Sequence, residues 1–107
     1  HTILLKFPGP TTLDRVGIYW GWNDNLNYQP YAMYMTSQVV NIEALINGSF
    51  QQVATLTGTS AVALTSVTFP EVTTTQLRLV QPSMKGAPTY PENMWLSEVY
   101  YNKGFGP

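Results

Sequence analysis

Tryptophan and tyrosine side chains stand beside amides and carboxylates in two segments, Gly21–Gln38 and Pro82–Trp95. Sugar rings have apolar C–H faces that stack on aromatic rings, and their hydroxyls pair with planar amides and carboxylates. The composition of these segments therefore predicts a surface that binds a hydroxyl-rich ring. The candidate ligand-binding residues are Trp22, Asn23, Asp24, Asn27, Tyr28, Tyr31, Tyr90, Asn93 and Trp95.

The aromatic residues also have a purely structural interpretation. Trp20 continues the apolar face of Val16 and Ile18, which predicts a core position. Trp22 extends the same face, so a core position and a ligand contact remain equally open. For Tyr28, Tyr31 and Tyr34, loop packing is favoured over ligand contact. Trp95 shares a face with Val99 and Tyr101, which favours the core.

Groups suited to catalysis are scarce. The single histidine is His1, which leaves no histidine pair for a metal, and no nucleophile elbow accompanies a serine. The six carboxylates could supply a pair for glycoside hydrolysis, and Asp24 and Glu92 both fall in predicted loops. The sequence nevertheless indicates a protein that is not an enzyme, with no catalytic residue and no cofactor.

Composition excludes several classes of partner. Charged residues make up 10% of the chain and the net charge is −1, which provides no basic groove for nucleic acid. There is no cysteine, and no apolar run approaches the roughly 20 residues of a membrane-spanning helix. Low charge with abundant threonine and asparagine fits an extracellular, secreted or particle-surface location.

The elements that would position these residues are short strands separated by turn residues. Period-two alternation with β-branched and aromatic residues predicts strands at residues 1–7, 13–22, 40–44, 50–56, 61–69, 76–81 and 94–101. Pro8-Gly9-Pro10 and Pro70-Glu71 are predicted to interrupt them, and Asn47-Gly48 predicts a hairpin turn. No window has sustained helical periodicity. We therefore predict one all-β domain over residues 1–107, an antiparallel β-sandwich of the jelly-roll type.

Short motifs in this order resemble the discoidin-type, galactose-binding-domain-like superfamily. It includes coagulation-factor C domains and family 32 carbohydrate-binding modules. The resemblance covers the chain from Leu13 onward. The matching residues are Val16, Ile18 and Trp20, then Asn47, Gly48 and Phe50, then Leu77-Arg78-Leu79, then Leu96-Ser97-Glu98-Val99.

The resemblance implies a jelly-roll sandwich that binds a glycan through its loops, with aromatic residues before the last strand among the contacts. The opening part of such domains often holds a structural calcium and has no counterpart here, so no calcium site is transferred. The chain is then the C-terminal portion of a longer domain or a minimal variant. Galactose-binding members also use a loop arginine, and no Arg, Lys or His lies between Gly21 and Asn47.

Two functions from different classes fit the sequence. The first is a non-catalytic carbohydrate-binding module whose partner is a glycan or polysaccharide. The second is a structural β-sandwich in a surface layer, filament, phage tail or capsid, where copies or other domains are the partners. The aromatic and amide residues of the loops favour the first, and the low charge favours the second.

Three structural expectations follow from the alternation pattern. The loops Gly21–Gln38 and Pro82–Asn93 should lie at the same end of the sandwich. Arg78 should pair with Glu98, because their strands are consecutive and therefore expected to be neighbours. The expected core consists of Val16, Ile18, Trp20, Phe50, Leu77, Leu79 and Val99.

Overall fold

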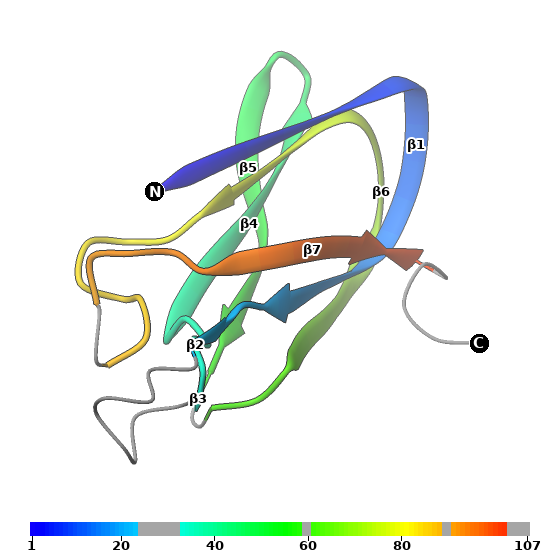
Figure 1. Cartoon of the computed structure of the whole chain (residues 1–107). Helices are drawn as coiled ribbons and strands as arrows, with labels where there is room; N and C mark the ends of the chain where they lie inside the picture. The colour runs from blue at the N-terminus through cyan, green and yellow to red at the C-terminus, as the bar shows by residue number, and fades with distance from the viewer. Residues whose placement is uncertain (24–32, 59–60, 89–90, 103–107) are drawn as a thin grey trace.

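A computed structural model describes residues 1–23, 33–58, 61–88 and 91–102, and it is almost entirely β-strand. Within these residues there is no α-helix, and no helix long and apolar enough to cross a membrane. The strands are β1 (Thr2–Trp20), β2 (Trp22–Asn23), β3 (Met33–Tyr34), β4 (Val39–Ile46), β5 (Ser49–Thr57), β6 (Leu64–Val80) and β7 (Leu96–Tyr101) (Figure 1). The all-β prediction is confirmed.

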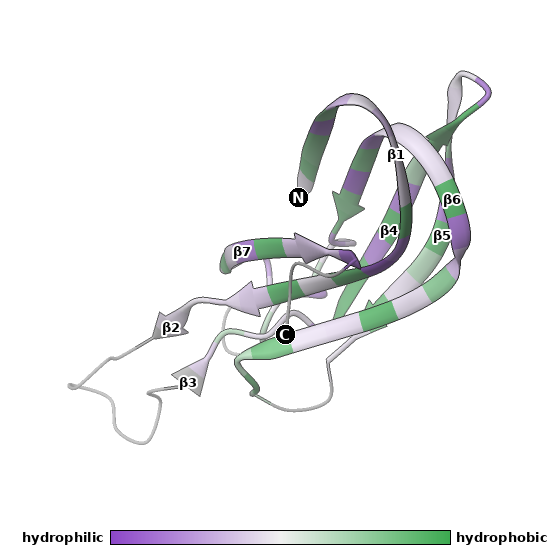
Figure 2. Ribbon diagram, turned by 90° about the vertical axis from the view of Figure 1, so that its right-hand side faces the viewer, coloured by the Kyte–Doolittle hydropathy of each residue, from purple (hydrophilic) through white to green (hydrophobic). Residues whose placement is uncertain are grey.

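One antiparallel sheet contains five of these strands, in the order β5-β4-β6-β1-β7, and β2 pairs with β3 separately. The long strands β1 and β6 lie side by side over most of their length and bend together (Figures 1 and 2). On one side of the bend the end of β6 pairs with β4, which pairs in turn with β5. On the other side the end of β1 pairs with β7. The sandwich is therefore one sheet folded over on itself.

The bend of β1 and β6 lies at the prolines that were expected to end strands, so that expectation was wrong. The pairing register shifts twice at the bend. From Lys6 to Thr11, β1 advances by five residues while its partner β6 advances by two, so the extra residues are in β1. From Leu13 to Arg15 the extra residues are in β6. Proline lacks an N–H for the ladder, and a bulge is where a strand tolerates that loss. Pro8-Gly9-Pro10 and Pro70 therefore bend the ladder without breaking it.

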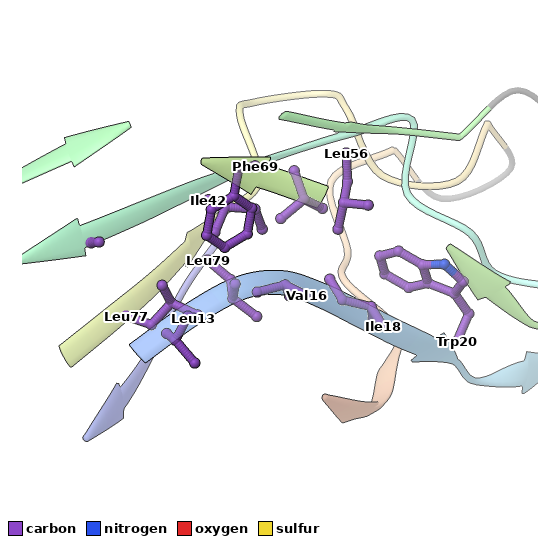
Figure 3. Close-up of a cluster of buried hydrophobic side chains, with 11 residues drawn as sticks. Leu13, Val16, Ile18, Trp20, Ile42, Leu56, Phe69, Leu77 and Leu79 are labelled. Carbon is purple, nitrogen blue, oxygen red and sulfur yellow. The ribbon is translucent and has the colours of Figure 1, made fainter. Parts of the chain in front are cut away.

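The hydrophobic core fills the space between the two halves of the folded sheet (Figure 3). Side chains from the second half of β1 meet side chains from β4 and the end of β6. The buried cluster comprises Leu13, Val16, Ile18, Trp20, Val40, Ile42, Ala44, Leu56, Phe69, Leu77 and Leu79. Five predicted core residues are confirmed: Val16, Ile18, Trp20, Leu77 and Leu79. Val99 is half-buried and packs against this cluster.

Phe50 was wrongly assigned to the core. Asn47 and Gly48 have φ of 52° and 83°, which fits the predicted two-residue hairpin turn. This turn pairs Phe50 with Leu45, on the face of β4 that also carries Glu43. The ring of Phe50 therefore lies on the outer face, where the guanidinium carbon of Arg78 is 4.2 Å from its centroid.

The expected pair between Arg78 and Glu98 is also wrong, because β1 lies between β6 and β7. Arg78 lies opposite Glu43 of β4, and its Nε donates to the Glu43 carboxylate at 2.6 Å. Glu98 lies opposite Tyr19 and accepts a hydrogen bond from the Tyr100 hydroxyl. That hydrogen bond, with some burial and the charge of Glu98, raises the pKa of Tyr100 above its ordinary value.

Truncating a side chain between the two halves should cost far more than truncating one outside them. For Leu79→Ala we expect a loss of about 2–5 kcal/mol in the free energy of unfolding, since Leu79 is fully buried. Leu4 is 45% exposed, so Leu4→Ala should change stability by only about 0.5 kcal/mol. Urea denaturation of both variants measures the difference, and equal losses would contradict the placement of the core.

A double-mutant cycle checks the pairing of Arg78. We expect Arg78→Met and Glu43→Gln to couple by about 0.5–1 kcal/mol, the range of a solvent-exposed ion pair, since 37% of the Arg78 side chain is exposed. The cycle of Arg78→Met with Glu98→Gln should give no coupling. Coupling to Glu98 in place of Glu43 would show that the strand order is wrong.

Candidate binding surface

Only part of the predicted site falls within the described residues. Trp22, Asn93 and Trp95 are described in full, and Asn23 is described for its main chain, which pairs with Met33. The remaining candidates, Asp24, Asn27, Tyr28, Tyr31 and Tyr90, lie outside the described residues, so their roles stay predictions.

The described ends of the two predicted loops lie at the same end of the sandwich, as expected. The main-chain N–H of Gly21 donates to the carbonyl of Trp95 at 2.6 Å. Gln38 donates its main-chain N–H to the carbonyl of Lys85 at 2.7 Å and its side-chain amide to the carbonyl of Gly86 at 2.9 Å. Main-chain and side-chain hydrogen bonds therefore join the two segments directly.

Trp22 projects from this end of the sandwich and is 52% exposed. It lies opposite Tyr34 in the β2–β3 pair, and the two ring centroids are 4.8 Å apart at an interplanar angle of 70°. An edge-to-face contact fixes the orientation of a ring without covering both of its faces. Of the two possibilities that the sequence left open for Trp22, the structure removes the core position.

Asn93 and Trp95 lie on the facing segment. Asn93 is exposed, and its carbonyl accepts a hydrogen bond from the side-chain amide of Gln81 at 2.9 Å. Trp95 is half-buried against Gly21, where an added Cβ would lie 3.1 Å from the Trp95 carbonyl oxygen and 3.7 Å from Cε3 of its ring. The small residue at position 21 therefore lets the two segments approach closely.

Gln81 and Ser37 complete this end, and they were not among the predicted site residues. Both are buried, at 3% and 2% exposure, and the Ser37 hydroxyl donates to the Gln81 side-chain oxygen. A signal was available in the sequence, since Leu77, Leu79 and Gln81 fall on one face of a strand. A polar residue that continues a buried face needs polar partners, and here the two segments supply them.

Two hollows among the described residues can be compared with the predicted surface. A hollow of about 310 Å³ borders the second segment and is lined by His1, Gln81, Pro82, Ser83, Met84, Pro91 and Glu92. A larger groove of about 770 Å³ lies at the bend of β1 and the end of β7, lined by Tyr100, Tyr101 and residues near Asp14. It contains none of the predicted site residues. The predicted surface is therefore an exposed aromatic edge and coincides with neither of these hollows.

No group of three or more His, Asp and Glu side chains within the described residues is placed to hold a metal ion.

Comparison of the fold with solved structures finds carbohydrate-binding modules. Chitosan-binding module 1 from the chitosanase/glucanase of Paenibacillus sp. IK-5 matches 94% of this chain and 67% of its own length, with a TM-score of 0.66 and 17% identity. A module described as GH31 CBM32-2 bound to GalNAc matches 95% of this chain and 63% of its own length, with a TM-score of 0.60 and 17% identity.

A putative alpha-L-fucosidase from Bacteroides thetaiotaomicron matches 96% of this chain, with a TM-score of 0.62 and 16% identity. The chain spans only 20% of that protein's length. No family model matches the sequence, and no curated protein matches it.

The chain has the same fold as these two carbohydrate-binding modules, one of which is described as CBM32-2. This confirms the fold that the sequence motifs implied. The chain spans about two thirds of the length of each of these modules.

The close approach of Gly58 to the first segment provides a test of how rigidly this end is built. The Gly58 N–H donates to the Gln38 carbonyl at 3.0 Å, and an added Cβ would overlap the Ser37 carbonyl and lie 2.7 Å from Cγ2 of Thr36. We expect Gly58→Ala to lower stability by about 1–3 kcal/mol through overpacking. Gly9→Ala meets no atom within 4 Å and is the matched control. Thermal unfolding of the two variants compares them, and equal midpoints would contradict the tight packing.

Proposed function

We propose that this chain is a non-catalytic carbohydrate-binding module that stacks a sugar ring on Trp22. The observation that carries the proposal is a half-exposed tryptophan, oriented by an edge contact with Tyr34, at the end of a sandwich whose fold is that of glycan-binding modules. Exposed aromatic rings are costly in water, and a fixed one is a suitable platform for the apolar face of a sugar.

Polar partners for the sugar hydroxyls come from the same end of the sandwich. Asn93 is exposed on the facing segment, and the Gln81 contact to its carbonyl leaves its side-chain amide available to a ligand. Asn23, Asp24 and Asn27 are the predicted partners on the first segment. The proposal is therefore a single site that uses an aromatic platform from one segment and an amide from the other.

The proposed partner is a glycan or polysaccharide, and the proposed location is extracellular, secreted or on a particle surface. The similar modules are described as binding chitosan in one case and GalNAc in another. Both ligands contain 2-amino-2-deoxy sugars, so chitosan oligomers and GalNAc should head the panel of test ligands. Neither nucleic acid nor membrane lipid is a proposed partner, since the net charge is −1.

A glycan array followed by isothermal titration of the best ligand tests the proposal. We expect Trp22→Ala to weaken binding about tenfold or more, as expected when the central aromatic contact of an interface is removed. Its matched control is Tyr101→Ala, which removes an aromatic side chain of 40% exposure at the far end of β7. Both variants should be measured well below their unfolding midpoints, since Tyr101 also makes an edge contact with Phe7.

The outcomes distinguish the two functions that the sequence left open. Binding that Trp22→Ala weakens and Tyr101→Ala preserves supports the module. No binding to any glycan, or equal binding by both variants, would contradict the proposed site and return the structural β-sandwich to consideration.

A further inference from the structure

We propose that Gln81 is a positioning residue that holds the two segments of the binding surface together as one unit. The inference rests on the proposed function for its consequence in glycan binding. Its structural basis is independent of that function, because it concerns hydrogen bonds in the free protein. The side chain of Gln81 is hydrogen-bonded to the Ser37 hydroxyl and the Asn93 carbonyl, so it would act through the main chain that carries Trp22 and Asn93.

The hydrogen bonds at this end form a closed ring through both segments. Gly21 donates its N–H to the Trp95 carbonyl at 2.6 Å and accepts at its own carbonyl from the Met35 N–H at 2.9 Å. Two residues beyond Met35, the Ser37 hydroxyl donates to the side-chain oxygen of Gln81.

The side-chain amide of Gln81 then donates to the carbonyl of Asn93 at 2.9 Å, and Asn93 is two residues from Trp95. Gly21 and Gln81 are thus the two bridges of the ring, one main-chain and one side-chain. Trp22 follows directly after the first bridge, and Asn93 is bound to the second.

The environment of Gln81 explains why this bridge should be rigid. The residue is 3% exposed. Its side-chain oxygen accepts a hydrogen bond from Ser37 on the first segment, and its side-chain nitrogen donates one to Asn93 on the second. Its main chain is also fixed, since its N–H donates to the His1 carbonyl at 2.8 Å and its carbonyl accepts from the His1 amino group at 3.1 Å. A buried amide whose partners are removed loses its hydrogen bonds without regaining water, so the bridge is expensive to open.

An apolar residue could fill the same space, which makes the polar choice informative. Met at position 81 has nearly the same length as Gln and would continue the buried face of Leu77 and Leu79. It would leave the Ser37 hydroxyl and the Asn93 carbonyl without their partner. We infer that the amide is present because it fixes two polypeptide segments at once, which hydrophobic packing alone does not do with the same directional precision.

The test compares Gln81→Met with Gln76→Met. Gln76 is the same residue type five positions earlier on β6, half-buried on the opposite face, and its side chain makes no hydrogen bond within the described residues. Ser37→Ala is the second test variant, because it removes one of the two Gln81 contacts with little change in volume. It keeps the proposal testable if Gln81→Met fails to fold.

Amide hydrogen exchange of the ligand-free protein is the first measurement. In Gln81→Met we expect exchange at Gly21 and Met35 to speed up about tenfold or more relative to Gln76→Met, while the amides of Ala44 in β4 and Leu56 in β5 stay within about twofold. The N–H groups of Gly21 and Met35 donate to the carbonyls of Trp95 and Gly21, so faster exchange there reports the loss of the ring. Equal exchange at these amides in the two variants would overturn the proposal.

Glycan affinity is the second measurement. We expect Gln81→Met to weaken binding about tenfold, within the usual range of coupling between sites, with a smaller effect of Ser37→Ala and none of Gln76→Met. The double variant with Ser37→Ala should bind no more weakly than Gln81→Met alone, since both act on one bridge. Additive losses would overturn the single-bridge interpretation. If the unmodified protein binds no glycan, the proposed function fails, and the exchange result still decides the role of Gln81.

Discussion

The continuous pairing of β1 with β6 through a shared bend is the constraint on which the rest of the structure depends. In a flat antiparallel pair, the end of β1 at Trp20 and the end of β6 at Val80 would lie at opposite ends of the ladder. Folding the ladder over brings these two ends together. The segments that follow them, which carry Trp22 and Asn93, therefore meet at one end of the sandwich.

Two kinds of interaction hold the folded ladder closed. Over most of the interface, apolar side chains between the two halves of the sheet supply the free energy that favours the folded state. This contribution is large, but it does not fix the direction of any one contact. At the loop end the interface changes to hydrogen bonds, through Gln81, Ser37 and the main chain of Gly21. Directional bonds there fix the relative position of two irregular segments, which the proposed binding surface would require.

The outer face of the sheet shows a different use of polar residues. Arg78, Glu43 and Phe50 form a cluster across three neighbouring strands, with the guanidinium between a carboxylate and an aromatic ring. This cluster is partly exposed, and exposed ion pairs contribute little to stability. Phe50 and Arg78 were read from the sequence as motif positions of the family, and the structure shows that their side chains lie on the opposite side of the sheet from the core.

The sequence by itself determined what depends on local alternation and turn chemistry: strands, the Asn47-Gly48 hairpin, the buried face of Val16, Ile18 and Trp20, and an aromatic segment after it. These follow from the period of two and from residues that favour positive φ. Only the tertiary structure decided which strands are neighbours. The insertion of β1 between β6 and β7 gave Arg78 a different partner, and the bend turned two apparent strand breaks into bulges. The tertiary structure also decided the hydrogen-bond partners of Gln81, because the partners of a buried amide come from other segments of the chain.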